Sequence, residues 1–200
     1  MLFRSAKDGE PLHNYDGVLA AFRLLTDADG AGLARRRVTV STSGLAPAIE
    51  RLAGEPKPPR LAVSLNATTD AVRDRLMPVN RRYPLARLLE ACRKFAAATG
   101  ERHTFEYVLL SGINDTDADV VRLGKLLRSH PAKLNLIPFN AVPGWLPYTA
   151  PERSRVVAIR DRLLAAGLPV SIRWSRGADA RAACGQIGRA SCRERVCHNV

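Results

Sequence analysis

The stretch Arg37-Val38-Thr39-Val40-Ser41-Thr42-Ser43-Gly44, with Pro47 soon after it, displays the building unit of this chain of 200 residues. Residues 36–42 alternate in character and are rich in β-branched side chains, which predicts a strand. The polar run that ends in glycine predicts a turn, and Pro47 suits the first turn of a helix that extends to Leu52. The stretch therefore predicts a strand, a polar turn and a helix in succession.

The same unit recurs along the rest of the chain. A first helix is expected at residues 15–26, and further strands at residues 61–66, 105–110, 134–138 and 170–174. A helical segment separates each of these strands from the next. Strands that alternate with helices at this spacing predict an α/β fold with a parallel sheet and right-handed crossovers, either an open sheet or part of a (β/α) barrel.

Capping residues mark where several of these helices begin. Thr69 can cap a helix that runs to residue 76, and Asp115 or Thr116 can cap a helix that runs to residue 129. The capping box Thr149-Ala150-Pro151-Glu152 predicts the start of a helix that ends at residues 166–167.

The helix expected at residues 85–99 is strongly amphipathic. Its apolar stripe includes Leu88, Cys92 and Phe95, and Gly100 is a good signal for its C-terminal end. We therefore expect Cys92 to lie in the hydrophobic core.

The chain is strongly basic, with 31 Lys and Arg against 19 Asp and Glu and a net charge of +12. Most of the basic residues are arginines, whose planar guanidinium suits phosphate, so we expect a polyanionic partner. The alternative is that the arginine content reflects the base composition of the genome. The sequence has no apolar run of about 18 residues and no signal-peptide core at its start, so we expect a cytoplasmic protein without a membrane partner.

Cys184 is the one cysteine whose surroundings suggest chemistry. It lies in Arg176-Gly177-Ala178-Asp179-Ala180-Arg181-Ala182-Ala183-Cys184-Gly185-Gln186, among residues too small to cover it and near two arginines that would favour a thiolate. Such a setting is typical of a nucleophile, although ordinary packing of small residues is the alternative. The four cysteines form no Cys-x-x-Cys pair, and we expect neither a disulfide scaffold nor a metal site in this chain.

Polar residues follow several of the predicted strands. Because working residues of (β/α) barrels lie where the strands end, these residues are expected to converge on one rim, although each could also serve a turn. They are Ser41, Ser64, Asn66, Asn140 and the segment that holds Cys184.

Taken together, these motifs resemble those of the RlmN family of radical S-adenosylmethionine RNA methyltransferases. Five ordered motifs carry the resemblance, from about Gly9 to Gln186: Gly9-Glu10-Pro11-Leu12-His13-Asn14, residues 37–44, Ser64-Leu65-Asn66-Ala67, Leu136-Ile137-Pro138-Phe139-Asn140, and residues 176–186. The resemblance implies an incomplete radical-SAM-type, TIM-like (β/α) barrel.

The resemblance also assigns roles in binding S-adenosylmethionine. Gly9 and Glu10 would hold the methionyl amine, since a carboxylate is the natural partner of an ammonium. The rest of that cofactor would be contacted by hydroxyl, backbone and amide groups of Ser41, Ser64, Leu65, Asn66 and Asn140.

Cys184 would then carry the methyl group. The resemblance implies that its thiolate takes a methyl group by displacement, and that a radical generated from a second S-adenosylmethionine at a [4Fe-4S] cluster activates that group for addition to adenine C2. The expected partners are 23S rRNA, tRNA and an external electron donor, and the expected full-length protein is a monomer. Alternatives are a Cfr-like adenine-C8 methyltransferase, a non-catalytic basic RNA-binding module, and an unrelated barrel lyase with Cys184 as nucleophile.

The sequence also departs from the family pattern. The Cys-x-x-x-Cys-x-x-Cys motif that would hold the cluster does not occur in it. We therefore expect a C-terminal fragment that is inactive by itself, with a partial barrel at residues 9–186. Residues 1–8 and the tail 187–200 are expected not to be native, and we expect no metal site from Cys192, Cys197 and His198.

Overall fold

The computed structural model describes residues 2–3, 9–140 and 148–174. Within them, six parallel strands form one sheet in the order of the sequence. The strands are β1 (Leu2–Phe3), β2 (Thr39–Thr42), β3 (Arg60–Ser64), β4 (His103–Leu109), β5 (Ala132–Pro138) and β6 (Val170–Ile172). Because every crossover moves one strand in the same direction, the sheet winds as in a (β/α) barrel and does not reverse as in a doubly wound sheet.

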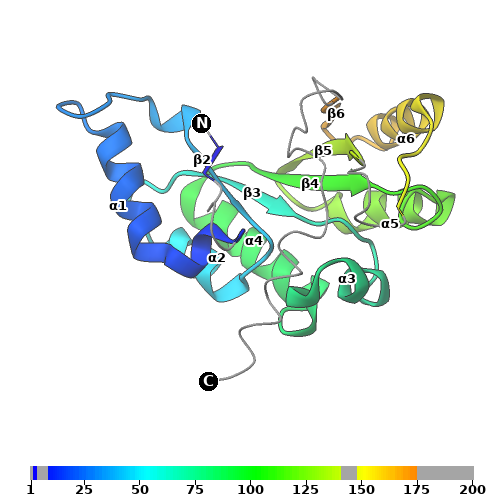
Figure 1. Cartoon of the computed structure of the whole chain (residues 1–200), viewed down its shortest axis with the longest axis horizontal. Helices are drawn as coiled ribbons and strands as arrows, with labels where there is room; N and C mark the ends of the chain where they lie inside the picture. Colours follow the sequence, from blue (N-terminus) through cyan, green and yellow to red (C-terminus); the bar gives the residue numbers. More distant parts are fainter. Residues whose placement is uncertain (1, 4–8, 141–147, 175–200) are drawn as a thin grey trace.

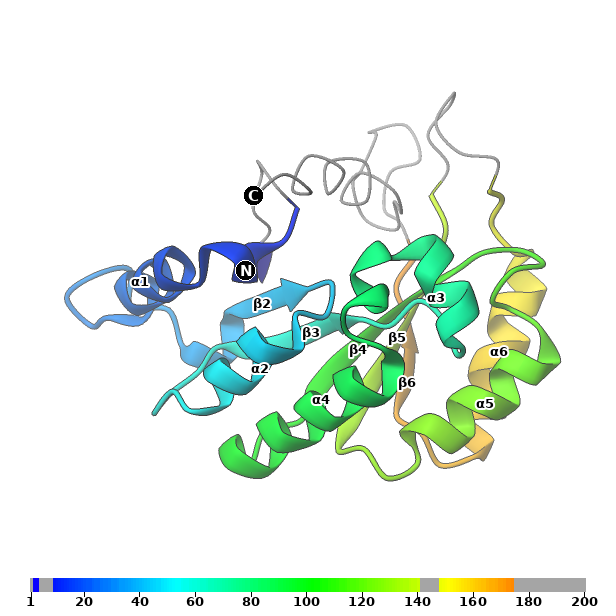
Figure 2. The ribbon, with the colours of Figure 1, turned by 90° about the horizontal axis from the view of Figure 1, so that it is seen from below.

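The helices lie along one face of this sheet. Figures 1 and 2 show α2, α4 and α5 along that face, with α6 beside β5 and β6. The α-helices are α1 (Tyr15–Thr26), α2 (Ala46–Ala53), α3 (Asp70–Leu76), α4 (Leu85–Thr99), α5 (Asp117–Leu127) and α6 (Arg153–Ala165). Short 3-10 helices occur at η1 (Pro11–Asn14), η2 (Arg35–Arg37) and η3 (Pro78–Arg81). In the part of the chain that the structure describes the sheet is open, so the predicted incomplete barrel is confirmed.

Side-chain alternation along the strands separates a core face from a polar face. Val63 and Phe105 are fully buried in the large core that the helices cover, together with Leu88 of α4. Successive side chains of a strand point to opposite faces, so Ser64 and Glu106 lie on the other face of the sheet, beside each other in the register of β3 and β4. This second face would be the inside of a complete barrel.

Several predictions of local structure are confirmed. The helices at residues 15–26 and 85–99 have the predicted bounds, and the second ends at Gly100, whose φ of 67° is the left-handed conformation that glycine adopts readily. Cys92 is fully buried. Thr69 accepts a hydrogen bond from the N–H of Val72, as expected for its cap.

Two other local predictions are wrong. The strand predicted from residue 36 begins only at Thr39, because Arg35–Arg37 form a 3-10 turn and the Arg35 side chain reaches the carbonyl oxygen of Pro58 at 2.9 Å. The predicted capping box at Thr149 does not form, because α6 begins at Arg153. A capping box forms instead at Thr116 and Asp119, at the start of α5.

Candidate active site

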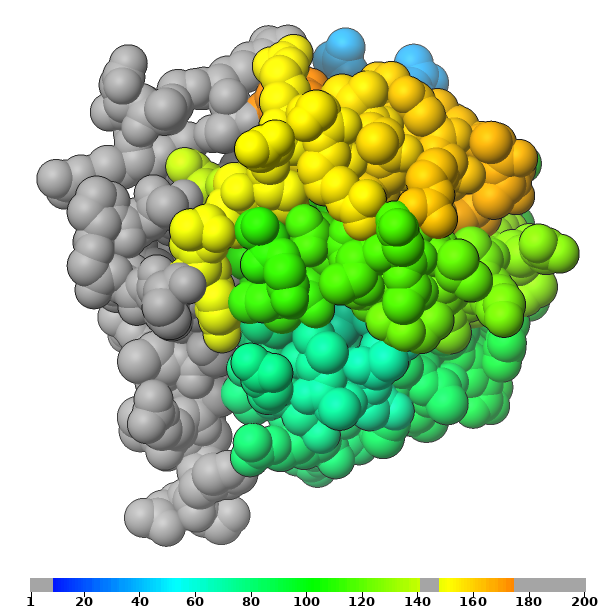
Figure 3. Space-filling view, turned by 90° about the vertical axis from the view of Figure 1, so that its right-hand side faces the viewer, coloured from blue at the N-terminus to red at the C-terminus, as the bar shows by residue number. Residues whose placement is uncertain are grey.

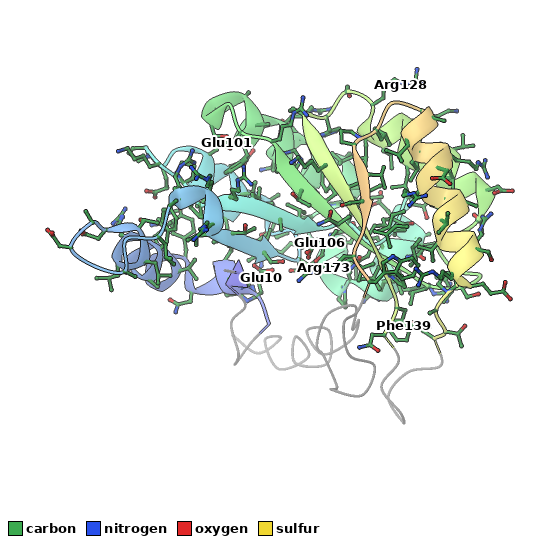
Figure 4. The ribbon with its side chains drawn as sticks, turned by 90° about the horizontal axis from the view of Figure 1, so that it is seen from above. Glu10, Glu101, Glu106, Arg128, Phe139 and Arg173 are labelled. Carbon is green, nitrogen blue, oxygen red and sulfur yellow. The ribbon has the colours of Figure 1, made fainter. Side chains whose placement is uncertain are left out.

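The candidate site lies at the carboxyl-terminal ends of the strands. Figure 4 shows Glu10 and Phe139 at one end of the molecule, with Glu101 and Arg128 at the opposite end. Phe139 directly follows β5, and its N–H donates to the carbonyl oxygen of Leu109, the last residue of β4. We call this edge the carboxyl rim.

Glu10 is the buried carboxylate of the carboxyl rim. Gly9, with φ of 73°, turns the chain so that the Glu10 side chain points inward, and 3% of Glu10 is exposed. Its Oε1 accepts from the N–H of Leu12 at 3.0 Å, and its Oε2 accepts from the N–H and the Oγ of Ser43 at 2.5 and 2.6 Å. No Lys or Arg of the described residues forms an ion pair with it. Within the described part of the chain the carboxyl group of Glu10 thus lacks a cationic partner, which suits a bound ammonium group.

Ser41 and Ser64 are brought together on the polar face of the sheet. Ser41 of β2 pairs with Ala62 of β3, two residues before Ser64, so the two hydroxyl groups belong to adjacent strands. Ser41 is buried and Ser64 is half-buried. The register therefore places these two residues on the same face of the sheet and on adjacent strands.

Leu65 and Asn66 use their side chains for the fold. The Leu65 side chain is buried in the core on the helix side of the sheet. Asn66 has a positive φ of 55°, and its Oδ1 accepts from the N–H of Val108 at 2.9 Å while its Nδ2 faces the sulfur of Met77 at 3.3 Å. Neither side chain is free for a cofactor, and backbone groups are also engaged: the Leu65 N–H donates to the carbonyl oxygen of Glu106 at 2.9 Å, and the Asn66 carbonyl oxygen accepts from Nδ2 of Asn114 at 2.8 Å.

Arg73 organises the carboxyl rim, although the sequence analysis did not single it out. Its guanidinium is fully buried and donates to the carbonyl oxygens of Ser43 (2.7 Å), Ser64 (3.0 Å) and Leu65 (3.0 Å). It also donates to Oδ1 of Asn80 at 2.9 Å. Burial lowers the pKa of Arg73 to about 10, so the group remains charged at neutral pH. One side chain therefore ties the ends of β2 and β3, and through Ser43 it is linked to Glu10.

The spacing of Arg73 and Leu76 in the sequence could have indicated that Arg73 is buried. Arg73 and Leu76 share one face of α3, and both are buried. A charged residue on the apolar face of a short helix requires buried acceptors, and the ends of parallel strands supply carbonyl oxygens.

A second polar group lies deeper on the same face of the sheet. Glu106 of β4 is nearly buried and forms an ion pair of 3.5 Å with Arg173, which follows β6. Figure 4 shows the two labelled side chains close together on the side of the carboxyl rim. In the register of the sheet, Glu106 lies between Ser64 and Asn135, whose Oδ1 accepts from Oγ of Ser171. Glu106, a charged residue within the strand predicted at 105–110, was the available signal for this polar row.

The remaining site predictions fall at or beyond the limit of the described residues. Asn140 is half-buried and directly precedes the undescribed residues 141–147. Cys184, and with it Cys192 and Cys197, lies outside the described residues. Cys92, by contrast, is a buried thiol whose pKa burial raises to about 12, so it is a core residue and no nucleophile.

The described residues offer neither a metal-binding cluster nor a membrane-spanning helix. Over 2–3, 9–140 and 148–174, no three or more His, Cys, Asp or Glu side chains gather in a way that could hold a metal ion. None of the helices in these ranges is long and apolar enough to cross a membrane.

Comparison with known proteins identifies the family. Residues 8–124 match the radical SAM superfamily. The chain is 58% identical over 179 residues to the dual-specificity RNA methyltransferase RlmN of Anaeromyxobacter sp. (strain Fw109-5), covering 90% of this chain and 47% of that protein. It is 51% identical to the RlmN of Pelobacter propionicus, covering 90% of this chain and 51% of that protein. The chain thus spans about half the length of these relatives.

Solved structures agree with this result. A radical SAM methyltransferase from Sphaerobacter thermophilus superposes with a TM-score of 0.85 at 47% identity, covering 91% of this chain and 53% of that one. A domain of a pyruvate-formate lyase-activating enzyme from Bacteroides vulgatus shares the fold alone, with a TM-score of 0.66 at 17% identity and coverage of 86% and 98%. The sheet, the acidic carboxyl rim and these matches lead to one conclusion: the chain belongs to the radical SAM superfamily, and over about 90% of its length it is similar to RlmN methyltransferases.

Proposed function

We propose that this chain is the C-terminal part of a radical S-adenosylmethionine methyltransferase that methylates adenine C2 in 23S rRNA and tRNA. The observation that carries the proposal is the Glu10 carboxylate, buried at the carboxyl rim and without a cationic partner among the described residues. RNA methyltransferase relatives at 51–58% identity supply the reaction class.

The carboxyl rim has the donor set that S-adenosylmethionine requires. Glu10 would accept hydrogen bonds from the methionyl ammonium, while Gly9 leaves room beside the carboxylate because it has no side chain. Ser41 and Ser64 would offer hydroxyl groups, and Asn140 an amide. Leu65 and Asn66 would contribute through their backbone. Once bound, the cofactor would supply the methyl group and, at the iron–sulfur cluster of the family, the radical that activates it.

The cluster does not fit the residues present in this chain. The sequence contains no Cys-x-x-x-Cys-x-x-Cys motif, and the described residues gather no set of ligands. We therefore propose that this 200-residue chain alone is inactive.

Cys184 would be the methyl carrier in the complete enzyme. Its thiolate would form a new S–C bond to the methyl group as the bond between that methyl and the sulfonium sulfur breaks, which leaves a thioether on Cys184. The support is the motif at residues 176–186, which lies outside the described residues.

The cellular setting follows from the substrate. The net charge of +12 supports a partner with a phosphate backbone, and with 23S rRNA and tRNA as substrates the reaction would take place in the cytoplasm. An external electron donor and a monomeric full-length protein complete the proposal. Residues 9–186 would form the barrel part, while residues 1–8 and 187–200 would not belong to the native enzyme.

A chimera tests this proposal directly. Residues 9–186 would replace the matching part of the Anaeromyxobacter RlmN, whose own remaining half would supply the cluster. We expect the chimera to form C2-methyladenosine on RNA, measured by mass spectrometry against C2- and C8-methyladenosine standards. The variants Cys184→Ala and Glu10→Gln should each abolish the product.

Glu101→Gln is the matched control, because Glu101 is a carboxylate at the opposite end of the strands. The control chimera should keep its activity. Formation of C8-methyladenosine would contradict the proposed C2 specificity and favour a Cfr-like enzyme. A folded chimera that binds RNA without methylating it would favour a binding module.

A further inference from the structure

We propose that the segment 70–83, which contains α3 and η3, is a binding surface for the phosphate backbone of RNA. Three arginines carry it: Arg75, Arg81 and Arg82. The inference deepens the proposed function, on which it rests, by locating where the RNA substrate contacts this part of the protein. We call this surface the α3–η3 platform.

The three arginines are exposed, and their charge is not neutralised. None of them forms an ion pair among the described residues, whereas arginines elsewhere do, as in Arg87 with Glu50 or Arg155 with Asp117. The Arg82 guanidinium lies 5.6 Å from the centre of the Tyr83 ring, which favours a defined orientation. The platform therefore offers three positive charges that are available to a ligand.

The acidic residues of the platform are hydrogen-bonded to other groups and form no ion pair with these arginines. Asn80, of which 1% is exposed, donates to Oδ1 of Asp70 at 3.0 Å and to Oδ1 of Asp74 at 2.6 Å. Asp70 also accepts from the N–H of Leu85 at 2.8 Å. Both carboxylates thus stabilise the turn and leave the arginine charges unpaired.

Arg73 fixes the platform to the cofactor side of the molecule. Its guanidinium joins Asn80 to the carbonyl oxygens of Ser43 and Ser64 at the carboxyl rim. The buried side of α3 therefore holds the rim, while the exposed side carries the arginines. Figure 3 shows this segment, in teal, at the molecular surface beneath α5 and α6. An RNA bound here would lie next to the site that binds the methyl donor.

The chemistry of the ligand follows from the type of side chain. A guanidinium presents several N–H groups in a plane and matches the oxygens of a phosphate, and three of them would displace the counterions of about three phosphates. A protein partner would be expected to need an apolar contact area, whereas the exposed residues of the platform are the three arginines, Asp70 and Ala71.

The test compares two triple variants of the 200-residue chain. The first is Arg75→Gln, Arg81→Gln and Arg82→Gln. The second neutralises Arg36, Arg102 and Arg128, which are exposed at the amino-terminal ends of the strands and also unpaired among the described residues. Both variants lose three positive charges, so a general effect of net charge would weaken both equally.

Binding is measured with a fluorescein-labelled RNA hairpin that has an unpaired adenosine in its loop, at a series of salt concentrations. The platform variant should bind on the order of tenfold more weakly or worse, and the slope of log K against log salt should fall by roughly 2 to 3. The control variant should stay close to the unmodified chain. Equal losses in the two variants, no loss in the platform variant, or no RNA binding by the unmodified chain would each overturn the inference.

A second measurement separates this inference from the proposed function. In the RlmN chimera, the platform variant should raise KM for RNA and leave kcat unchanged. If the unmodified chimera fails to methylate RNA, the proposed function is wrong, while the binding comparison on the chain still decides the role of the platform.

Discussion

The two ends of the parallel strands solve the problem of buried polar groups in opposite ways. At the carboxyl rim, the buried Arg73 has an acceptor for each of its three nitrogens, and Glu10 accepts three hydrogen bonds. At the amino-terminal end, His103 is fully buried and neither ring nitrogen has a hydrogen-bond partner among the described residues. Its ring lies edge-on to Phe105, with 4.7 Å between the ring centres.

The difference separates a binding end from a stabilising end. A rim whose backbone carbonyls are held by one cation keeps its loops in place for a ligand, as expected where (β/α) folds carry their chemistry. The amino-terminal end uses a neutral imidazole as an apolar side chain, with His130 at 6.3 Å between the ring centres. This packing contributes to stability but depends on the histidines remaining uncharged.

The largest expected effect comes from breaking the rim. Arg73→Met would leave three carbonyl oxygens and Asn80 without their donor, so we expect a loss of about 4 kcal/mol in the free energy of unfolding. Urea denaturation at neutral pH measures it. Arg35→Met is the matched control, since Arg35 also donates to a carbonyl oxygen and a carboxylate but is 37% exposed, and it should lose about 1 kcal/mol. Similar losses of unfolding free energy in the two variants would contradict the proposed difference between the two ends of the strands.

Low pH should destabilise the packing of His103 at the amino-terminal ends of the strands. Burial, and then the neighbouring His130, lowers the pKa of His103 from 6.5 to about 4. Between these values the unfolded chain binds a proton that the folded chain does not. The contribution of neutral His103 to the free energy of unfolding is therefore complete above pH 6.5 and is lost as the pH falls toward 4. The expected loss is about 3 kcal/mol.

His103→Leu isolates this contribution, because a side chain of similar size replaces the imidazole. Urea denaturation over a series of pH values should show a flatter acid limb for the variant than for the unmodified chain. An unchanged acid limb would assign the pH dependence to other groups, such as His130.

The smallest effect concerns two threonines in the loops that follow β4 and β5. Thr116→Ala removes the capping box of α5 and should lower the free energy of unfolding by about 1 kcal/mol. Thr149→Ala should change it by less than about 0.5 kcal/mol, because Thr149 contributes its carbonyl oxygen, not its side chain, to the N–H of Ser111. Thermal denaturation can compare the two, and equal effects would contradict the boundary of α6.

Local signals predicted the elements of the fold well. The apolar stripe and Gly100 defined α4, and Thr69 and Thr116 were identified as caps, because these features depend on neighbours in the chain. The predicted starts of β2 and α6 were wrong, because Arg35 and Thr149 interact with residues that are distant in the sequence.

The candidate site was predicted in part. Ser41 and Ser64 could be selected as polar residues at strand ends, whereas Glu10 was selected only by the resemblance to the RlmN family. The structure holds Glu10 against Ser43, directly after β2, and Ser41 and Ser64 lie on adjacent strands. Arg73 and the pair of Glu106 and Arg173 were missed, since each depends on an acceptor or a charge contributed by another strand.

The sequence by itself determined that this protein is a chain of strand-turn-helix units in parallel order, with polar residues after the strands and a large excess of arginine. Periodicity, turn residues and charge are local properties, and they can be read without coordinates. Only the tertiary structure decided which arginine is buried as a clamp and which remain free for a ligand. That choice depends on where the carbonyl oxygens of adjacent strands end, and their position is set by the register of the sheet and not by any single segment.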